Sequence, residues 1–120
     1  MKSDFMNSKD FRLLLQNKIE AFAHFIYDIT KNFPNEERYG ITSQIRRVAL
    51  SVLLNFVEGF ARNNDKVYQN FLKISYGSLK ETECLINFCY KEKMLNQENL
   101  HISQNQIEEI SKMLWKIMQG

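Results

Sequence analysis

The chain has 120 residues, of which 44% are apolar and 25% are charged, and these values are ordinary for one globular domain. The net charge of +2 is too small to argue by itself for nucleic-acid binding, which usually needs a strongly basic patch. The apolar runs are shorter than a membrane span and the first residues lack the apolar core of a signal peptide, so we expect a cytoplasmic protein.

Apolar residues recur at intervals of three and four along four segments of the chain. This spacing predicts four helices, at 9–32, 42–62, 65–91 and 103–119. One proline and few glycines also favour long helices over many-turned β architectures. Short polar loops join the segments and no strand pattern separates them. We therefore expect an all-α fold, an antiparallel up-down-up-down four-helix bundle over 9–119, preceded by a disordered segment at 1–8.

The helix ends carry local signals. The Phe33-Pro34 pair should end the first helix, because a residue before proline is pushed away from helical geometry. Thr42 or Ser43 is a candidate cap for the second helix. Ser103, with Gln106 three residues later, has the pattern of a capping box that would open the fourth helix.

The second helix lies in the most informative segment, 39–62. Most of its circumference is apolar, so we expect it to be buried on most sides. It carries one narrow polar stripe, called the seam below: Gln44, Arg47, Ser51, Asn55, Glu58 and Arg62. Buried polar groups need hydrogen-bond partners. The first interpretation is therefore a buried network that fixes helix register or subunit assembly.

Two glycines belong to this structural interpretation of the seam. Gly59 ends the second helix, and Gly77 lies in the middle of the third, where glycine costs about 1 kcal/mol relative to alanine. We expect Gly77 to allow the backbone of another helix to approach, and the alternative is that it admits a ligand. The second interpretation is that basic side chains around the second and third helices contact phosphate. The candidates for nucleic-acid binding are Arg46, Arg47, Arg62, Lys66 and Lys73.

Patterns typical of an active site or a metal site do not occur. Cys84 and Cys89 are five residues apart, so they point in different directions on a helix and cannot pair within it. His24 and His101 have no glutamate three residues before them, which excludes the Glu-x-x-His pairs of di-iron bundles. We expect a protein that is not an enzyme and that has no metal or cofactor.

Several motifs occur in a characteristic order and spacing: FP-x-x-E at 33–37, YGITSQIRR at 39–47, N-x-x-EG at 55–59 and GSL-x-E at 77–81. With these motifs the chain resembles the four-helix bundle proteins encoded in intervening sequences of bacterial 23S ribosomal RNA genes. The resemblance covers roughly residues 19–118. The same superfamily includes the accessory variability determinant protein of diversity-generating retroelements. Many members have a proline in the second helix, and the run at 51–55 here has none.

The resemblance implies a bundle that assembles into a ring, typically a homopentamer. It also implies binding of RNA or DNA rather than catalysis. The alternative is an interaction scaffold, for example an accessory subunit of a reverse transcriptase, that binds a protein partner without touching nucleic acid. The family name describes a genomic location and does not define an activity.

Overall fold

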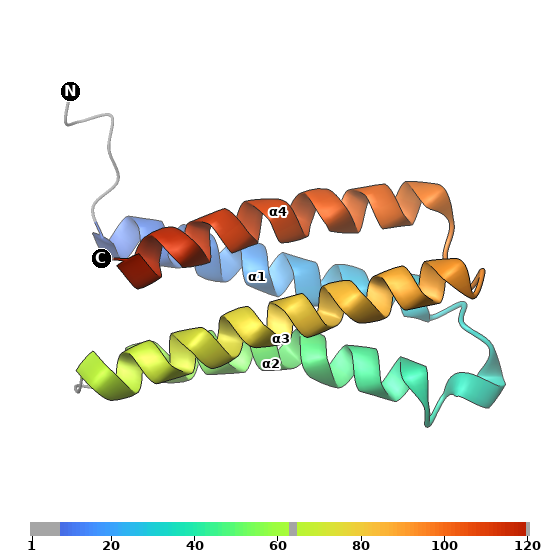
Figure 1. Cartoon of the computed structure of the whole chain (residues 1–120), viewed down its shortest axis with the longest axis horizontal. Helices are drawn as coiled ribbons and strands as arrows, with labels where there is room; N and C mark the ends of the chain where they lie inside the picture. Colours follow the sequence, from blue (N-terminus) through green and yellow to red (C-terminus); the bar gives the residue numbers. More distant parts are fainter. Residues whose placement is uncertain (1–7, 63–64, 120) are drawn as a thin grey trace.

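The computed structural model describes residues 8–62 and 65–119. Within them the chain forms four α-helices and one short 3-10 helix: α1 (Ser8–Thr30), η2 (Asn35–Glu37), α2 (Ile41–Phe60), α3 (Asp65–Lys91) and α4 (Gln97–Gln119). Consecutive α-helices run in opposite directions (Figure 1). The predicted all-α four-helix bundle is confirmed. The predicted disordered segment lies outside the described residues, except for Ser8, which begins α1.

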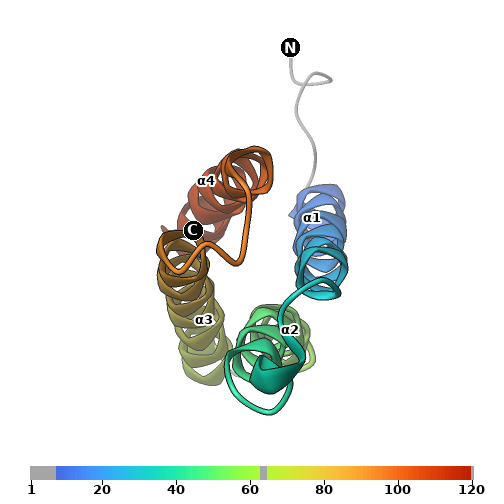
Figure 2. The same cartoon turned by 90° about the vertical axis from the view of Figure 1, so that its right-hand side faces the viewer.

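Each α-helix packs against the next one along the chain, and α1 packs against α4 to close the bundle. Seen end-on, the four helices occupy the corners of a four-sided arrangement (Figure 2). The core between them is apolar, as the three- and four-residue spacing predicts. The largest side chains with almost no exposed surface are Phe22, Phe56, Leu15, Ile19, Ile26, Ile45, Leu72, Leu79, Ile86, Ile107, Ile110 and Leu114.

The start of α2 differs from the prediction. The helix begins at Ile41, with Gly40 at the N-cap position and no side-chain cap. The predicted cap at Thr42 or Ser43 is therefore wrong. Thr42 lies inside the first turn, where its buried hydroxyl has no hydrogen-bond partner among the described residues. The carboxylate of Glu37 instead accepts a hydrogen bond from the Ile41 N–H at 3.4 Å.

The start of α4 also differs, because the helix begins at Gln97 rather than at residue 103. The predicted capping box is wrong. Ser103 is fully buried within the helix, and its hydroxyl donates to the Leu100 carbonyl at 2.8 Å. The capping side chain is Asn96, whose Oδ1 accepts from the Asn99 N–H at 2.7 Å. The first turn of α4 begins with Gln97, Glu98 and Asn99, so the sequence there has the composition of a loop.

Candidate functional site

The middle of the seam joins α2 to α3. The hydroxyls of Ser51 and Ser78 are 2.8 Å apart, and the Asn55 amide donates to both the carbonyl and the hydroxyl of Ser51 at 2.9 Å. Beside them, the Ser75 hydroxyl donates to the Val52 carbonyl at 2.7 Å. These bonds satisfy polar groups that are wholly or partly buried between the two helices. This part of the seam is a hydrogen-bond network that fixes the register of α2 against α3.

Gly59 marks the close approach of α2 and α3. It is buried, and a Cβ placed on it would lie 3.3 Å from the Phe71 Cβ and 3.4 Å from the Tyr68 carbonyl oxygen. Gly77 is the opposite case. It is exposed, and a Cβ placed on it would meet nothing within 4 Å. The expectation that Gly77 admits another helix of the same chain is therefore wrong, and Gly59 has that role.

The two ends of the seam are not part of the network. Gln44 and Arg47 are exposed. At the other end Arg62 forms an ion pair with Glu58, and both side chains are more than two-fifths exposed. The Arg62 guanidinium also lies 5.4 Å from the centre of the Phe71 ring. The seam is thus a buried network only in its middle, and its arginines face solvent.

Arg46 differs from the other candidate phosphate ligands. Its Nε donates to the Thr30 hydroxyl at 2.8 Å, and its Nη2 donates to the Tyr27 carbonyl at 3.2 Å. Its guanidinium also lies 4.6 Å from the centre of the Tyr27 ring. Because the last carbonyls of a helix lack partners within the helix, Arg46 stabilises the C-terminal end of α1. Its hydrogen bonds are directed at the protein, so it has an internal structural role.

The remaining basic candidates do not gather at one place. Arg62 and Lys66 are exposed and lie near the junction of α2 and α3, whereas Lys73 is exposed eight residues into α3. Arg47 is also exposed, but it lies 15 residues before Arg62, which corresponds to about 22 Å along a helix. The bundle therefore offers a basic group at the α2–α3 junction and a separate arginine near the other end of α2.

The solvent-facing side of α2 carries exposed apolar side chains, whereas the outer face of a surface helix is usually polar. Leu54 is 61% exposed, Val57 is 40% exposed, and Leu13 of the neighbouring α1 is 44% exposed. A shallow hollow of about 350 Å³ lies between the two helices, lined by Glu20, Ala23, His24, Tyr27, Leu50 and Leu53. We call this surface the α1–α2 face. The prediction that α2 is buried on most sides is confirmed, because its exposed residues are only Gln44, Arg47, Leu54 and Val57, and two of these four are apolar.

The two cysteines are free and have different surroundings. Cys84 is exposed, whereas Cys89 is buried, and burial raises the pKa of the Cys89 thiol to about 11. A buried neutral thiol is a poor nucleophile. Among the residues that the structure describes, no group of three or more His, Cys, Asp or Glu side chains is placed to hold a metal ion. The helices within 8–62 and 65–119 include none that is both long and apolar enough to span a bilayer.

The sequence patterns did not single out one further pair, Tyr76 of α3 and Trp115 of α4. Their ring centres are 6.0 Å apart, and Trp115 is 53% exposed. Trp115 lies to one side of the apolar stripe of its helix, between Lys112 and Lys116. This placement of an aromatic residue among lysines is the only signal that the sequence carries for the pair.

Comparison with known proteins identifies the family. A sequence model of the family described as 23S rRNA-intervening sequence protein matches residues 12–116. The chain belongs to this family. The fold is similar to that of a crystal structure of a protein with unknown function from the S23 ribosomal protein family of Bacteroides thetaiotaomicron VPI-5482, with a TM-score of 0.85. That protein is 23% identical in sequence, and the match covers 92% of this chain and 99% of the other. A search of curated proteins finds no match.

Proposed function

We propose that this 23S rRNA-intervening sequence family protein is a cytoplasmic, non-enzymatic bundle that associates with copies of itself and binds RNA. In this proposal the α1–α2 face mediates assembly, and exposed basic side chains provide contacts to phosphate. The observation that carries the first part is the exposure of Leu54, which is 61% exposed in the middle of a long helix. The family resemblance supports a homopentamer as the assembled form.

Burial of the α1–α2 face explains why α2 is apolar on its outer side. Exposed apolar surface that is continuous with a hollow is typical of interaction sites. The hollow is lined in part by Leu50 and Leu53 of α2, and Leu54 and Val57 of the same helix are exposed. Each leucine side chain that becomes buried contributes roughly 1.5–3 kcal/mol. Copies related by a closed symmetry would shield this surface from water.

Contact with RNA would use basic side chains that are exposed on the surface of the bundle. Arg47 and Lys73 are exposed, and Arg62 is partly neutralised by Glu58. Assembly would repeat this sparse set around a ring, so several weak phosphate contacts would act together. A net charge of +2 on one chain would correspondingly multiply in the oligomer.

Two measurements test the proposal. Light scattering should give a mass several times that of the 14.3 kDa chain, and Leu54→Glu should lower it, whereas Gln104→Glu on the exposed side of α4 should not. Anisotropy with a labelled RNA hairpin should show binding that weakens steeply between about 50 and 200 mM salt. A monomeric mass would contradict the assembly. Absence of binding at the lower salt concentration would contradict the RNA contact.

The α1–α2 face also favours a second candidate function, that of a scaffold or accessory subunit for a protein partner such as a reverse transcriptase. An apolar face of this kind fits a helix of another protein as well as it fits a second copy. Affinity capture from native cells, with and without nuclease, separates the two candidates. A partner that survives nuclease treatment and is lost in Leu54→Glu supports the scaffold, whereas loss of all partners after nuclease supports RNA binding.

A further inference from the structure

An exposed aromatic pair lies on the surface formed by α3 and α4. Trp115 is 53% exposed, and its ring packs against Tyr76 with centres 6.0 Å apart and planes inclined by 48°. Tyr76 itself is only partly exposed. One ring therefore supports the other from the side of α3, and the indole still presents much of its surface to solvent. An indole held in this way loses little conformational entropy when a flat ligand stacks on it.

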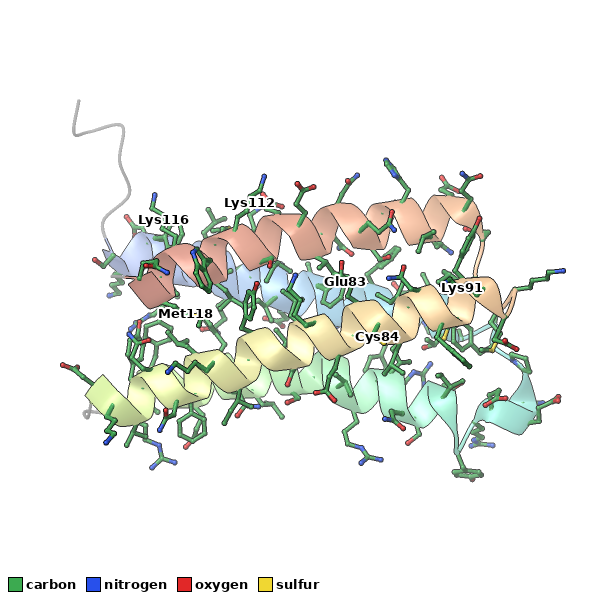
Figure 3. All side chains as sticks on the ribbon, viewed as in Figure 1. Glu83, Cys84, Lys91, Lys112, Lys116 and Met118 are labelled. Carbon is green, nitrogen blue, oxygen red and sulfur yellow. The ribbon has the colours of Figure 1, made fainter. Side chains whose placement is uncertain are left out.

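Lysines lie on both helices beside the aromatic pair. On α3, Lys73 is exposed three residues before Tyr76, and the Lys80 Nζ lies 5.4 Å from the centre of the Tyr76 ring. On α4, Lys112 lies three residues before Trp115. Lys112 and Lys116 extend from the side of α4 that faces away from α3 (Figure 3). Each of the two helices thus carries a lysine within about one helical turn of its aromatic residue.

Two glutamates near the aromatic pair form ion pairs with two of its lysines, and the third lysine leaves a net positive charge. Lys80 is 3.6 Å from Glu83, and Lys112 is 3.4 Å from Glu108. All four of these side chains are more than one-third exposed, so the two ion pairs are weak and their lysines can be drawn to a phosphate. Lys73 adds a positive charge.

Lys116 contributes less directly to this surface. Its Nζ lies 5.5 Å from the centre of the Phe11 ring of α1, so the amine is directed toward that helix. The phosphate contacts are therefore assigned to the other three lysines.

We propose that Tyr76 and Trp115 form a stacking platform for a base of a single-stranded nucleic acid, with Lys73, Lys80 and Lys112 binding the adjacent phosphates. This inference rests on the proposed RNA-binding function and specifies its ligand and its site. Bases within a duplex are stacked on each other, so only an unpaired base offers a free face to the indole. Aromatic side chains with nearby cations are the usual means of binding single strands without sequence preference.

The tryptophan provides the test, because Trp115 is the only one in the chain. The intact protein is titrated with oligoadenylate of about 12 nucleotides, a length within the range of known single-strand sites. We expect saturable quenching of the indole fluorescence. Trp115→Leu should weaken binding, measured by anisotropy, by about 5- to 150-fold, which corresponds to the stacking energy of one base.

Lysine variants test the phosphate contacts. Lys80→Gln and Lys112→Gln should each reduce the slope of log affinity against log salt by about 0.7. Lys31→Gln is the matched control, because Lys31 also forms an exposed ion pair, with Asp28 at 3.3 Å, but lies directly after the last residue of α1. Circular dichroism confirms that each variant is folded.

The outcomes separate this inference from the proposed function. If the RNA hairpin binds but oligoadenylate neither quenches Trp115 nor loses affinity in Trp115→Leu, the platform is refuted and RNA binding stands. If neither nucleic acid binds, both proposals fail. If acrylamide cannot quench Trp115 in the absence of nucleic acid, a second copy covers the indole, and the platform is refuted while assembly is supported. An equal effect of Lys31→Gln would refute the assignment of the lysines.

Discussion

Replacing Gly77 with alanine is expected to stabilise the isolated bundle. Gly77 lies in the interior of α3, where glycine is about 1 kcal/mol less favourable than alanine. It does not have a positive φ, and an added Cβ would meet nothing within 4 Å. The substitution therefore gains the helix propensity and encounters no steric clash. The free energy of unfolding should rise by about 1 kcal/mol.

Urea unfolding followed by circular dichroism measures this change. With a slope of about 1–3 kcal/mol per molar urea, the midpoint should rise by about 0.3–1 M. The matched control is Gly59→Ala, where the added Cβ would be 3.3 Å from the Phe71 Cβ, so crowding should cancel the gain. A Gly77→Ala midpoint that is unchanged or lowered at low protein concentration would refute the reasoning. It would mean that the space above Gly77 is filled in solution.

Three further variants test other parts of the bundle. Arg46→Ala should lower the free energy of unfolding by about 1.5–3 kcal/mol in urea titrations, because it removes charged hydrogen bonds to Thr30 and the Tyr27 carbonyl; recovery of full stability in Arg46→Gln would contradict this. Phe56→Ala should cost about 3–5 kcal/mol in the same assay, since the ring is fully buried, and a cost below about 1 kcal/mol would be inconsistent with that burial. Burial raises the pKa of Cys89 from 9.0 to about 11, so its contribution to stability is complete below pH 9 and is lost as the pH rises toward 11, where the unfolded chain carries the thiolate. Thermal unfolding should therefore show a smaller loss of stability over this pH range in Cys89→Ala than in the native chain, and equal losses would exclude the assignment.

Much of the fold could be predicted because apolar periodicity dictates it. The third helix was predicted with the bounds that the structure gives, 65–91. The predicted start of α4 differs from the observed one because the pattern at Ser103 resembles a helix cap. In the structure Ser103 lies inside the helix, where its hydroxyl donates to the carbonyl of Leu100 in the same helix. Local patterns cannot separate a cap from such a residue.

The candidate site was less predictable than the fold. Helix periodicity separates Arg46 from Arg47, but it cannot tell which of them turns inward, because that depends on where the end of α1 lies. The sequence also cannot tell whether Gly59 or Gly77 lies against a neighbouring helix. Distances between helices decide whether a glycine is needed, and a single sequence does not contain them. The exposure of Leu54 likewise follows from packing and not from composition.

The bundle closes by packing its first helix against its last. The helix pairs therefore differ in how much of the chain must be in place before they form. The α2–α3 hairpin joins neighbouring segments through the Ser75 and Ser78 hydroxyls, so only a short loop must close before they meet. The α1–α4 contact, which includes the ion pair between Lys18 and Glu109 at 3.0 Å, needs almost the whole chain to be in place. We therefore expect the α2–α3 hairpin to form early and the edge between α1 and α4 to separate first. Amide protons of α4, the helix that carries Trp115, will exchange with solvent before those of the hairpin.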